Sequence, residues 1–277
     1  MIPQLIRVFP RKTKASPNDK NAFFGPPPMF LGEINEIHIS VAFTWDRSKA
    51  EWLAKQWEPI APVKIGGPAY NKPGGNFIPG RYIREGYVIT SRGCPNCCWF
   101  CSVWKREGRK IRELPITEGW NVLDDNLLAC SFKHIMGVFK MLKRQTHKAE
   151  FTGGLEAARL KDWHVHALVE LKPRQMFFAY DTSDDYEPLL IEKMLKAAGF
   201  TRHQMRCYVL IGYRGDTFEK AEQRLRQTLE LGFFPMAMLY RDEIGVRDRQ
   251  WMRFQKPWAR PAAIYAMAKS MKSIKGD

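Results

Sequence analysis

The stretch Cys207–Leu239, CYVLIGYRGDTFEKAEQRLRQTLELGFFPMAML, carries the pattern from which the fold is predicted. It opens with a short apolar run, Cys207–Ile211, and closes with another, Pro235–Leu239. Between the runs, apolar residues recur at the spacing of one helix face, after a pair that resembles a capping box and before a glycine suited to end the helix. The residues of this helical pattern are Asp216, Glu219, Ala221, Leu225, Leu229 and Gly232. The stretch therefore predicts a strand, a helix and a second strand.

The same alternation recurs from residue 87 onward. Short apolar runs occur at Tyr87–Thr90, Asn121–Leu123, Glu150–Thr152, Met176–Tyr180, Cys207–Ile211 and Pro235–Leu239. Helical patterns lie between most of them, as at Leu127–Arg144 and Leu189–Ala198. Such alternation predicts an α/β fold in which residues 87–240 form a parallel sheet curled into a partial (β/α)6 TIM-like barrel. Functional residues are then expected at the carboxyl ends of the strands.

Three further regions surround this predicted barrel. Residues 1–33 are basic and then proline-rich, which indicates an arm with little regular structure. In residues 34–86, the run Ile37–Phe43, a helix opened by a capping box at Ser48 and Glu51, and a short strand at Val63–Ile65 predict a small parallel β-α-β subdomain followed by a linker. Residues 241–277 form a basic tail that contains aromatic residues.

Composition narrows the class of protein. The 277 residues are 45% hydrophobic, which excludes a disordered chain, and no apolar run is long enough to span a membrane. The first residues lack the apolar core of a secretion signal, so we expect a cytoplasmic protein. With 44 Lys and Arg against 29 Asp and Glu, the net charge is +15. This charge favours a polyanionic partner such as nucleic acid, and the alternative is a merely solubilising basic surface.

Four cysteines, Cys94, Cys97, Cys98 and Cys101, fall within one short stretch. Clustering of this kind favours a metal or iron–sulfur site in a reducing compartment over a disulfide scaffold. Two halves of a zinc site are the alternative, but adjacent Cys97 and Cys98 would not easily serve one tetrahedral ion. The remaining two cysteines, Cys130 and Cys207, are interpreted as buried small hydrophobic residues. His164 and His166 could suggest a second metal site, but we interpret them as surface or capping residues.

The spacing Cys94-x3-Cys98-x2-Cys101, with Phe100 before the last cysteine and a predicted strand before the first, resembles the signature of the radical SAM superfamily. The resemblance implies a [4Fe-4S] cluster held by the three cysteines, with the fourth iron left to bind S-adenosyl-L-methionine (SAM). An external donor of the flavodoxin or ferredoxin type would supply an electron. Reductive cleavage of SAM would then give a 5′-deoxyadenosyl radical that abstracts hydrogen from a substrate, and Cys97 would be a spectator.

The resemblance extends to the other strand ends. Gly153-Gly154-Leu155-Glu156 is similar to the Gly-Gly-Glu segment that holds the methionine amino group, although it has an inserted leucine. Glu156 could instead cap the following helix, and Asp181 could cap a turn at Thr182 and Ser183 instead of contacting the ribose. The cofactor-binding residues implied by the resemblance are Phe100, Gly153, Gly154, Glu156, Tyr180, Asp181, Leu210, Gly212 and Met236, the last of which could also be plain core.

Asp124-Asp125-Asn126 resembles the acidic strand ends of radical SAM proteins that carry a cobalamin-type domain, and residues 34–69 resemble a trimmed version of that domain. Bound cobalamin is not expected, because no Asp-x-His-x-x-Gly sequence supplies its usual lower ligand. The whole pattern looks like compact radical SAM proteins of the kind found in phage genomes, which implies the cytoplasm of a host cell.

The substrate is inferred from charge and from the basic tail. Arg249, Trp251 and Arg253 belong to a series of arginines interleaved with aromatic residues, a pattern suited to phosphate contact and base stacking, although an ordinary basic cap on the barrel is the alternative. We therefore favour a DNA base or nucleotide as the substrate, as in base hypermodification, and Asp124, Asp125 and Asn126 as further substrate contacts. The alternatives are a radical SAM enzyme acting on a peptide or small metabolite, and a non-enzymatic iron–sulfur or zinc protein that binds nucleic acid.

Overall fold

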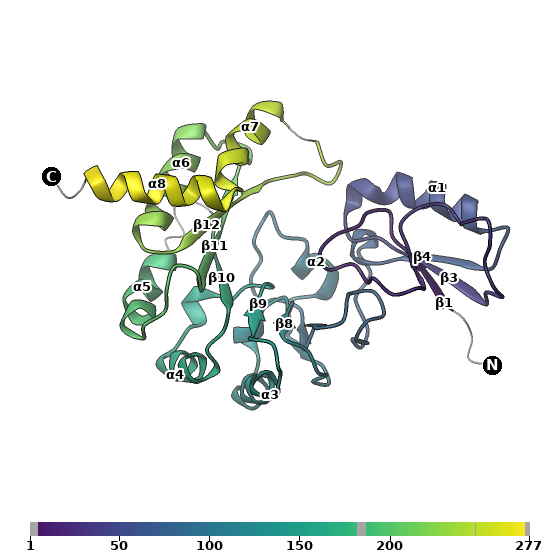
Figure 1. Cartoon of the computed structure of the whole chain (residues 1–277), viewed down its shortest axis with the longest axis horizontal. Coiled ribbons are helices and arrows are strands. Elements are labelled where there is room, and N and C mark those ends of the chain that lie inside the picture. Colours follow the sequence, from purple (N-terminus) through teal and green to yellow (C-terminus); the bar gives the residue numbers. More distant parts are fainter. Residues whose placement is uncertain (1–4, 182–186, 247, 275–277) are drawn as a thin grey trace. The chain divides into compact units, whose positions relative to one another are not determined.

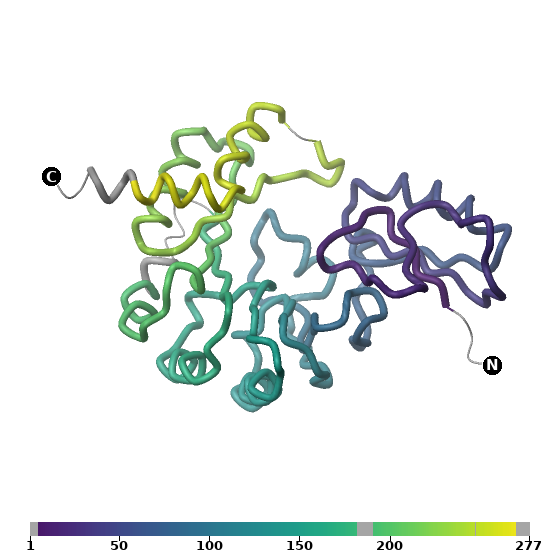
Figure 2. The backbone as a smooth tube through the Cα atoms, in the orientation of Figure 1, coloured from purple at the N-terminus to yellow at the C-terminus, as the bar shows by residue number. Residues whose placement is uncertain are grey.

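The structure is a computed structural model that describes residues 5–181, 187–246 and 248–274, whose backbone is traced in Figure 2. The chain forms two compact units, one of residues 1–119 with 243–245 and the other of residues 120–242 with 246–277. The sequence placed a boundary at residue 86, whereas the contacts group the cysteine stretch with the N-terminal residues. Within the described ranges, no helix is both long and apolar enough to cross a membrane.

The first unit contains a parallel sheet with the strand order β2-β1-β3-β4. Its strands are β1 (Leu5–Val8), β2 (Ala22–Phe23), β3 (Glu36–Ser40) and β4 (Val63–Gly66). The prediction of an arm over residues 1–33 is therefore wrong for β1 and β2. Ile6 pairs in register with Ile37 and is 1% exposed, so β1 is a central strand of the sheet. Its four residues are too few for the alternation of polar and apolar residues to stand out in the sequence.

The predicted β-α-β unit is confirmed. Helix α1 (Arg47–Trp57) connects the parallel strands β3 and β4, and its buried residues are Ala50, Leu53, Ala54 and Trp57, which recur at the spacing of one helix face. The predicted capping box is wrong, because the 3-10 turn η1 (Thr44–Asp46) brings the chain into the helix early. Asp46 is the N-cap residue, and Ser48 lies inside the helix. A second 3-10 turn, η2 (Pro68–Tyr70), follows β4.

The rest of the first unit positions the cysteine stretch. The described elements are the short strands β5 (Tyr87–Val88), β6 (Ser91–Arg92) and β7 (Arg112–Glu113) and the helix α2 (Val103–Glu107). Strands β6 and β7 pair antiparallel. All four clustered cysteines lie on the loop from β6 to α2, which we call the cysteine loop (residues 93–102).

The second unit contains the predicted strand–helix alternation. Strands β8 (Asn121–Val122), β9 (Glu150–Phe151), β10 (Gln175–Tyr180), β11 (Met205–Ile211) and β12 (Phe234–Leu239) are neighbours in chain order, and each adjacent pair is parallel. Between them come α3 (Phe132–Lys143), α4 (Asp162–Leu171), α5 (Glu187–Ala197) and α6 (Phe218–Glu230), with 3-10 turns η3 (Leu127–Ala129) and η4 (Ala157–Arg159). Figure 1 shows these helices along one side of the strands. Helices α7 (Arg249–Trp258) and α8 (Pro261–Ile274) complete this unit.

Two local predictions in this unit are wrong. Thr217, not Asp216, caps α6, and its side chain accepts a hydrogen bond from the backbone N–H of Lys220. The helix predicted over Leu127–Arg144 starts only at Phe132, after the N-cap Ser131, and Phe132 is 62% exposed although its spacing matches the buried residues that follow. Both errors arise at helix starts, where a shift of one residue turns a side chain by about 100° around the axis.

Candidate functional site

The cysteine loop begins with a glycine whose conformation sets its direction. Gly93 has φ +91°, and a Cβ atom at this position would lie 2.5 Å from the carbonyl oxygen of Lys110. A side chain is excluded here both by the backbone conformation and by the close approach of the neighbouring segment. The next residue, Cys94, donates its backbone N–H to the carbonyl of Gly108 at 3.2 Å. The entrance of the loop is thus fixed against the segment that follows α2.

The far end of the loop is a tight turn held by backbone and side-chain hydrogen bonds. The backbone N–H of Cys101 donates to the carbonyl of Cys98 at 3.1 Å, and the indole N–H of Trp104 donates to the same carbonyl at 3.0 Å. The backbone N–H of Val103 donates to the Sγ atom of Cys101 at 3.4 Å. A donor directed at sulfur stabilises a thiolate, which is the ligand form of cysteine.

Exposure separates the four clustered cysteines. Cys94, Cys98 and Cys101 are half-buried, whereas Cys97 is exposed. Phe100 is also half-buried, and its ring packs edge-on against Trp99 at a centroid distance of 5.3 Å. The three cysteines at the predicted ligand spacing are therefore less exposed than the fourth.

Glu107 braces the loop and was missed by sequence reasoning. Its carboxylate is 1% exposed and forms ion pairs with Arg92 at 3.6 Å, Arg106 at 3.0 Å and Arg112 at 2.6 Å. It also accepts the backbone N–H of Gly74. One carboxylate thus ties together β6, β7, α2 and the segment before them. Glu107 thus compensates part of the positive charge of three guanidinium groups next to the cysteine loop.

In the second unit, the carboxyl ends of β8 and β9 bring two predicted site segments together. A Cβ atom at Gly153 would lie 2.5 Å from the carbonyl oxygen of Asp124 and 2.8 Å from its nitrogen, so only glycine fits. The side-chain amide of Asn126 donates to the Glu156 carboxylate at 2.5 Å. Glu156 also accepts from Arg159 at 2.6 Å and does not cap the following turn through its side chain. The two segments form one polar edge.

Strand register decides which other predicted residues face a common side of the sheet. Tyr208 pairs with Met236, and Leu210 follows two residues later on the same strand, so these three side chains share a face. Tyr180 pairs with Val209 and lies on the opposite face, where its hydroxyl donates to Gln227 of α6 at 3.0 Å. Tyr180 is 2% exposed, and so it is a core residue on the helix side.

Tyr208 is a residue of the shared face that sequence reasoning did not identify. Its ring stacks on Phe177 at a centroid distance of 4.6 Å, and its hydroxyl donates to the carbonyl of Thr152 at 3.3 Å. Burial raises the pKa of Tyr208 to about 12. The phenol therefore remains a hydrogen-bond donor at neutral pH and spans from β11 to the end of β9. Only the alternation of side chains along a paired strand would have indicated this.

The turn after β11 is held by a buried ion pair. The Asp216 carboxylate accepts from the backbone N–H of Gly212 at 2.8 Å and from Arg224 at 2.9 Å. Arg224 also donates to the carbonyl of Leu210 at 2.9 Å. Gly212 has φ +72°, so the predicted adenine-lining segment ends in a glycine turn. Arg224 of α6 holds this turn through its bonds to Asp216 and Leu210.

Asp181 is half-buried at the end of β10. Burial raises the pKa of the Cys207 thiol, and the nearby negative charge of Asp181 raises it further. Cys207 is 0% exposed, which confirms it as a core residue. Thr182 and Ser183, which Asp181 could cap, lie outside the described residues.

Cys130 is half-buried and not the core residue predicted for it. Its sulfur lies in a group with Asp124 and His134 whose potential ligand atoms are all within 4.8 Å of one another. His164 is buried and accepts the backbone N–H of Lys161 through Nδ1, as the capping interpretation predicted, and His166 is exposed.

The basic tail forms an amphipathic helix. Arg249, Arg253 and Lys256 are exposed on α7. Trp251 packs on Phe218 of α6 at a centroid distance of 4.4 Å. The interleaved sequence thus separates into a basic outer face and an aromatic inner face. Trp251 serves packing, which weakens its predicted role in base stacking.

No model of a known protein family matches the chain, and a search of curated proteins gives no match either.

Proposed function

We propose that this chain is a radical SAM enzyme with a partial (β/α)6 barrel. The observation that carries the proposal is the state of the cysteine loop. The three cysteines at the C-x3-C-x2-C spacing are half-buried on a braced loop, one of them accepts a backbone N–H at sulfur, and Cys97 is exposed. Three thiolates on one loop suit a [4Fe-4S] cluster, which needs a fourth ligand from elsewhere.

Cys94, Cys98 and Cys101 would hold the cluster, and the Val103 N–H would stabilise the Cys101 thiolate. When bound, such a cluster would supply one electron for reductive cleavage of SAM, and an external donor of the flavodoxin or ferredoxin type would return that electron to the cluster. In the second unit, the Gly153–Gly154 backbone and the Glu156 carboxylate would bind the methionine group. The Gly212 turn and Leu210 would line the adenine, with Asp181 as the ribose contact.

The favoured substrate is a DNA base or nucleotide. The net charge of +15 and the exposed cations Arg249, Arg253 and Lys256 on one helix support this choice. Cationic side chains contact phosphate without reading sequence, so they position a nucleic acid while other groups select the base. A peptide or small metabolite is the alternative substrate.

The test is SAM cleavage by anaerobically reconstituted protein. We expect about four irons per chain by the three-cysteine argument, and release of methionine and 5′-deoxyadenosine in equal amounts after addition of SAM and dithionite. Incubation with candidate nucleic acids, followed by nucleoside mass spectrometry, tests the substrate. Protein that retains zinc, holds no iron and leaves SAM intact would contradict the proposal and favour a non-enzymatic metal protein.

A further inference from the structure

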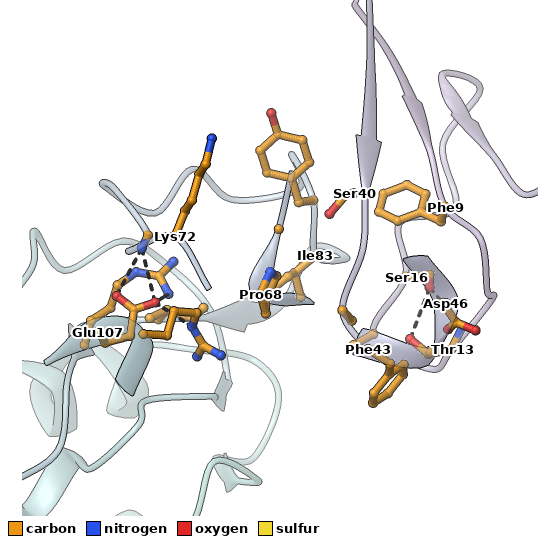
Figure 3. Close-up of a pocket in the computed structure, with 18 of the residues that line it drawn as sticks. Phe9, Thr13, Ser16, Ser40, Phe43, Asp46, Pro68, Lys72, Ile83 and Glu107 are labelled. Carbon is orange, nitrogen blue, oxygen red and sulfur yellow. Dashed lines mark hydrogen bonds and ion pairs between the residues drawn. The ribbon is translucent and has the colours of Figure 1, made fainter. Parts of the chain in front are cut away.

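The first unit contains a cavity of about 430 Å³ at the carboxyl edge of its parallel sheet (Figure 3). The residues just after three strands line it, namely Phe9 after β1, Phe43 after β3 and Pro68 after β4. Ligands of open parallel sheets bind in the crevice outside the carboxyl ends of the strands. The volume also falls within the range of pockets that hold small molecules.

The charge of the cavity wall is positive. Arg11, Lys72, Arg92 and Arg106 line it, together with the acidic residues Asp46 and Glu107. Each of these two carboxylates already forms an ion pair with at least one of the arginines. Asp46 accepts from Arg11 at 2.7 and 2.9 Å, and Glu107 pairs with Arg106 and Arg92. Among the described residues, Lys72 has no ion-pair partner and it is exposed at the rim of the cavity. A ligand with a negatively charged group could therefore form an ion pair with Lys72.

The remaining lining is largely apolar. Phe9, Phe43, Pro68, Ile83 and Ile89 contribute carbon surface, and the Ser40 side chain lies beside Phe9 in Figure 3. Apolar walls with a few polar groups bind a flat organic body and fix its orientation. The cavity therefore combines a place for a planar apolar group with a place for an anion.

We infer that this cavity binds a free nucleoside monophosphate, with its phosphate near Lys72 and the arginines and its base against the aromatic residues. Phosphate suits a lysine and arginine cluster because each N–H donor forms a charge-assisted hydrogen bond. Binding of the nucleotide does not depend on the proposed function. The further step, that this nucleotide is the substrate of the enzyme, rests on the proposed function.

The experiment is isothermal titration of the purified full chain with each of the four deoxynucleoside monophosphates and with the matching nucleosides. We expect one nucleotide to bind at one site per chain and its nucleoside to bind about 10- to 100-fold more weakly, since the nucleoside lacks the charge-assisted hydrogen bonds to phosphate. Lys72→Ala should weaken nucleotide binding by about the same factor, and Lys72→Arg should restore most of it. Lys49→Ala, which removes an exposed charge from α1, is the matched control and should change nothing.

Ser40→Phe, which fills the cavity, should abolish binding in protein whose circular dichroism is unchanged. Three results would overturn the inference. They are equal affinity for nucleotide and nucleoside, unchanged binding in Lys72→Ala, and binding of a single-stranded oligonucleotide without binding of any mononucleotide. SAM cleavage by the unmodified protein is measured separately. Nucleotide binding without cleavage would contradict the proposed function alone, and cleavage without nucleotide binding would contradict the cavity alone.

Discussion

Gly153, after β9, lies directly against the backbone of Asp124, after β8. Gly153→Ala should lower the free energy of unfolding by about 1–3 kcal/mol, because the added methyl group meets the Asp124 backbone, which cannot move as a flexible side chain would. Denaturant unfolding measures the effect. Gly66→Ala is the control, since a Cβ there meets nothing within 4 Å. If both variants are equally stable, the close approach of β8 and β9 is wrong.

His164 makes the free energy of unfolding depend on pH in the acidic range. Burial lowers its pKa to about 4, against an ordinary value of 6.5. The unfolded chain therefore binds a proton that the folded chain does not between these values, and stability should fall as the pH drops from about 6.5 to about 4. His164→Asn should lose part of this pH dependence in urea unfolding, and His166→Asn, at an exposed position, should keep it. An unchanged profile in His164→Asn would assign the acid sensitivity to other groups.

At the residue scale, the sequence predicted which polar and glycine residues follow each strand, but it did not predict which side chains form hydrogen bonds or ion pairs with one another. The approach of Asp124 to Gly153 and of Asn126 to Glu156 follows from parallel strands in chain order. Glu107 could not be predicted, because its arginine partners come from α2 and from the two-residue strands β6 and β7, which leave no periodic signal.

At the scale of elements, the buried pair Asp216–Arg224 connects the β11 turn to α6. Asp216→Ala should cost about 3–5 kcal/mol in unfolding free energy, since it leaves a guanidinium that is 2% exposed without its carboxylate. Glu222→Ala removes an exposed ion pair from the same helix and should cost less than about 1 kcal/mol. Similar losses in the two variants would mean that the buried pair does not hold the turn.

Helix α7 supports a prediction about nucleic acid. Arg249→Ala combined with Arg253→Ala should flatten the slope of log K against log salt for DNA binding by about 1–2 units, because fewer counterions are released. The control is Lys133→Ala with Lys140→Ala, which removes the same charge from the exposed side of α3. An equal change in the control would mean that the basic face of α7 is not a specific contact.

Helix and strand positions were predicted more accurately than helix starts. Apolar spacing over three turns located α1, α3 and α6, since burial of one face decides where a helix packs. The caps depend on single hydrogen bonds. Instead of starting after Ser48, α1 follows Asp46, which makes no side-chain capping bond, and α6 is capped by Thr217 instead of Asp216.

At the scale of the whole molecule, the sequence predicted two parallel α/β regions, and the structure contains them. The division between compact units was not predicted, because it depends on contacts between distant segments. The hydrogen bond from Gly74 to Glu107 is one such contact, and it joins the expected linker to helix α2. The strands β1 and β2 were missed because isolated runs of two to four residues carry little periodicity.

The most direct test of the central claim compares two adjacent cysteines. Cys98→Ala and Cys97→Ala remove the same thiol chemistry one residue apart, from a half-buried and an exposed position respectively. After anaerobic reconstitution, iron content and 5′-deoxyadenosine release with SAM and dithionite are measured for both variants. We predict that Cys98→Ala loses both and that Cys97→Ala retains both. Loss in Cys97→Ala with retention in Cys98→Ala would contradict the ligand assignment, and SAM left uncleaved by the unmodified protein with a full cluster would contradict the claim itself.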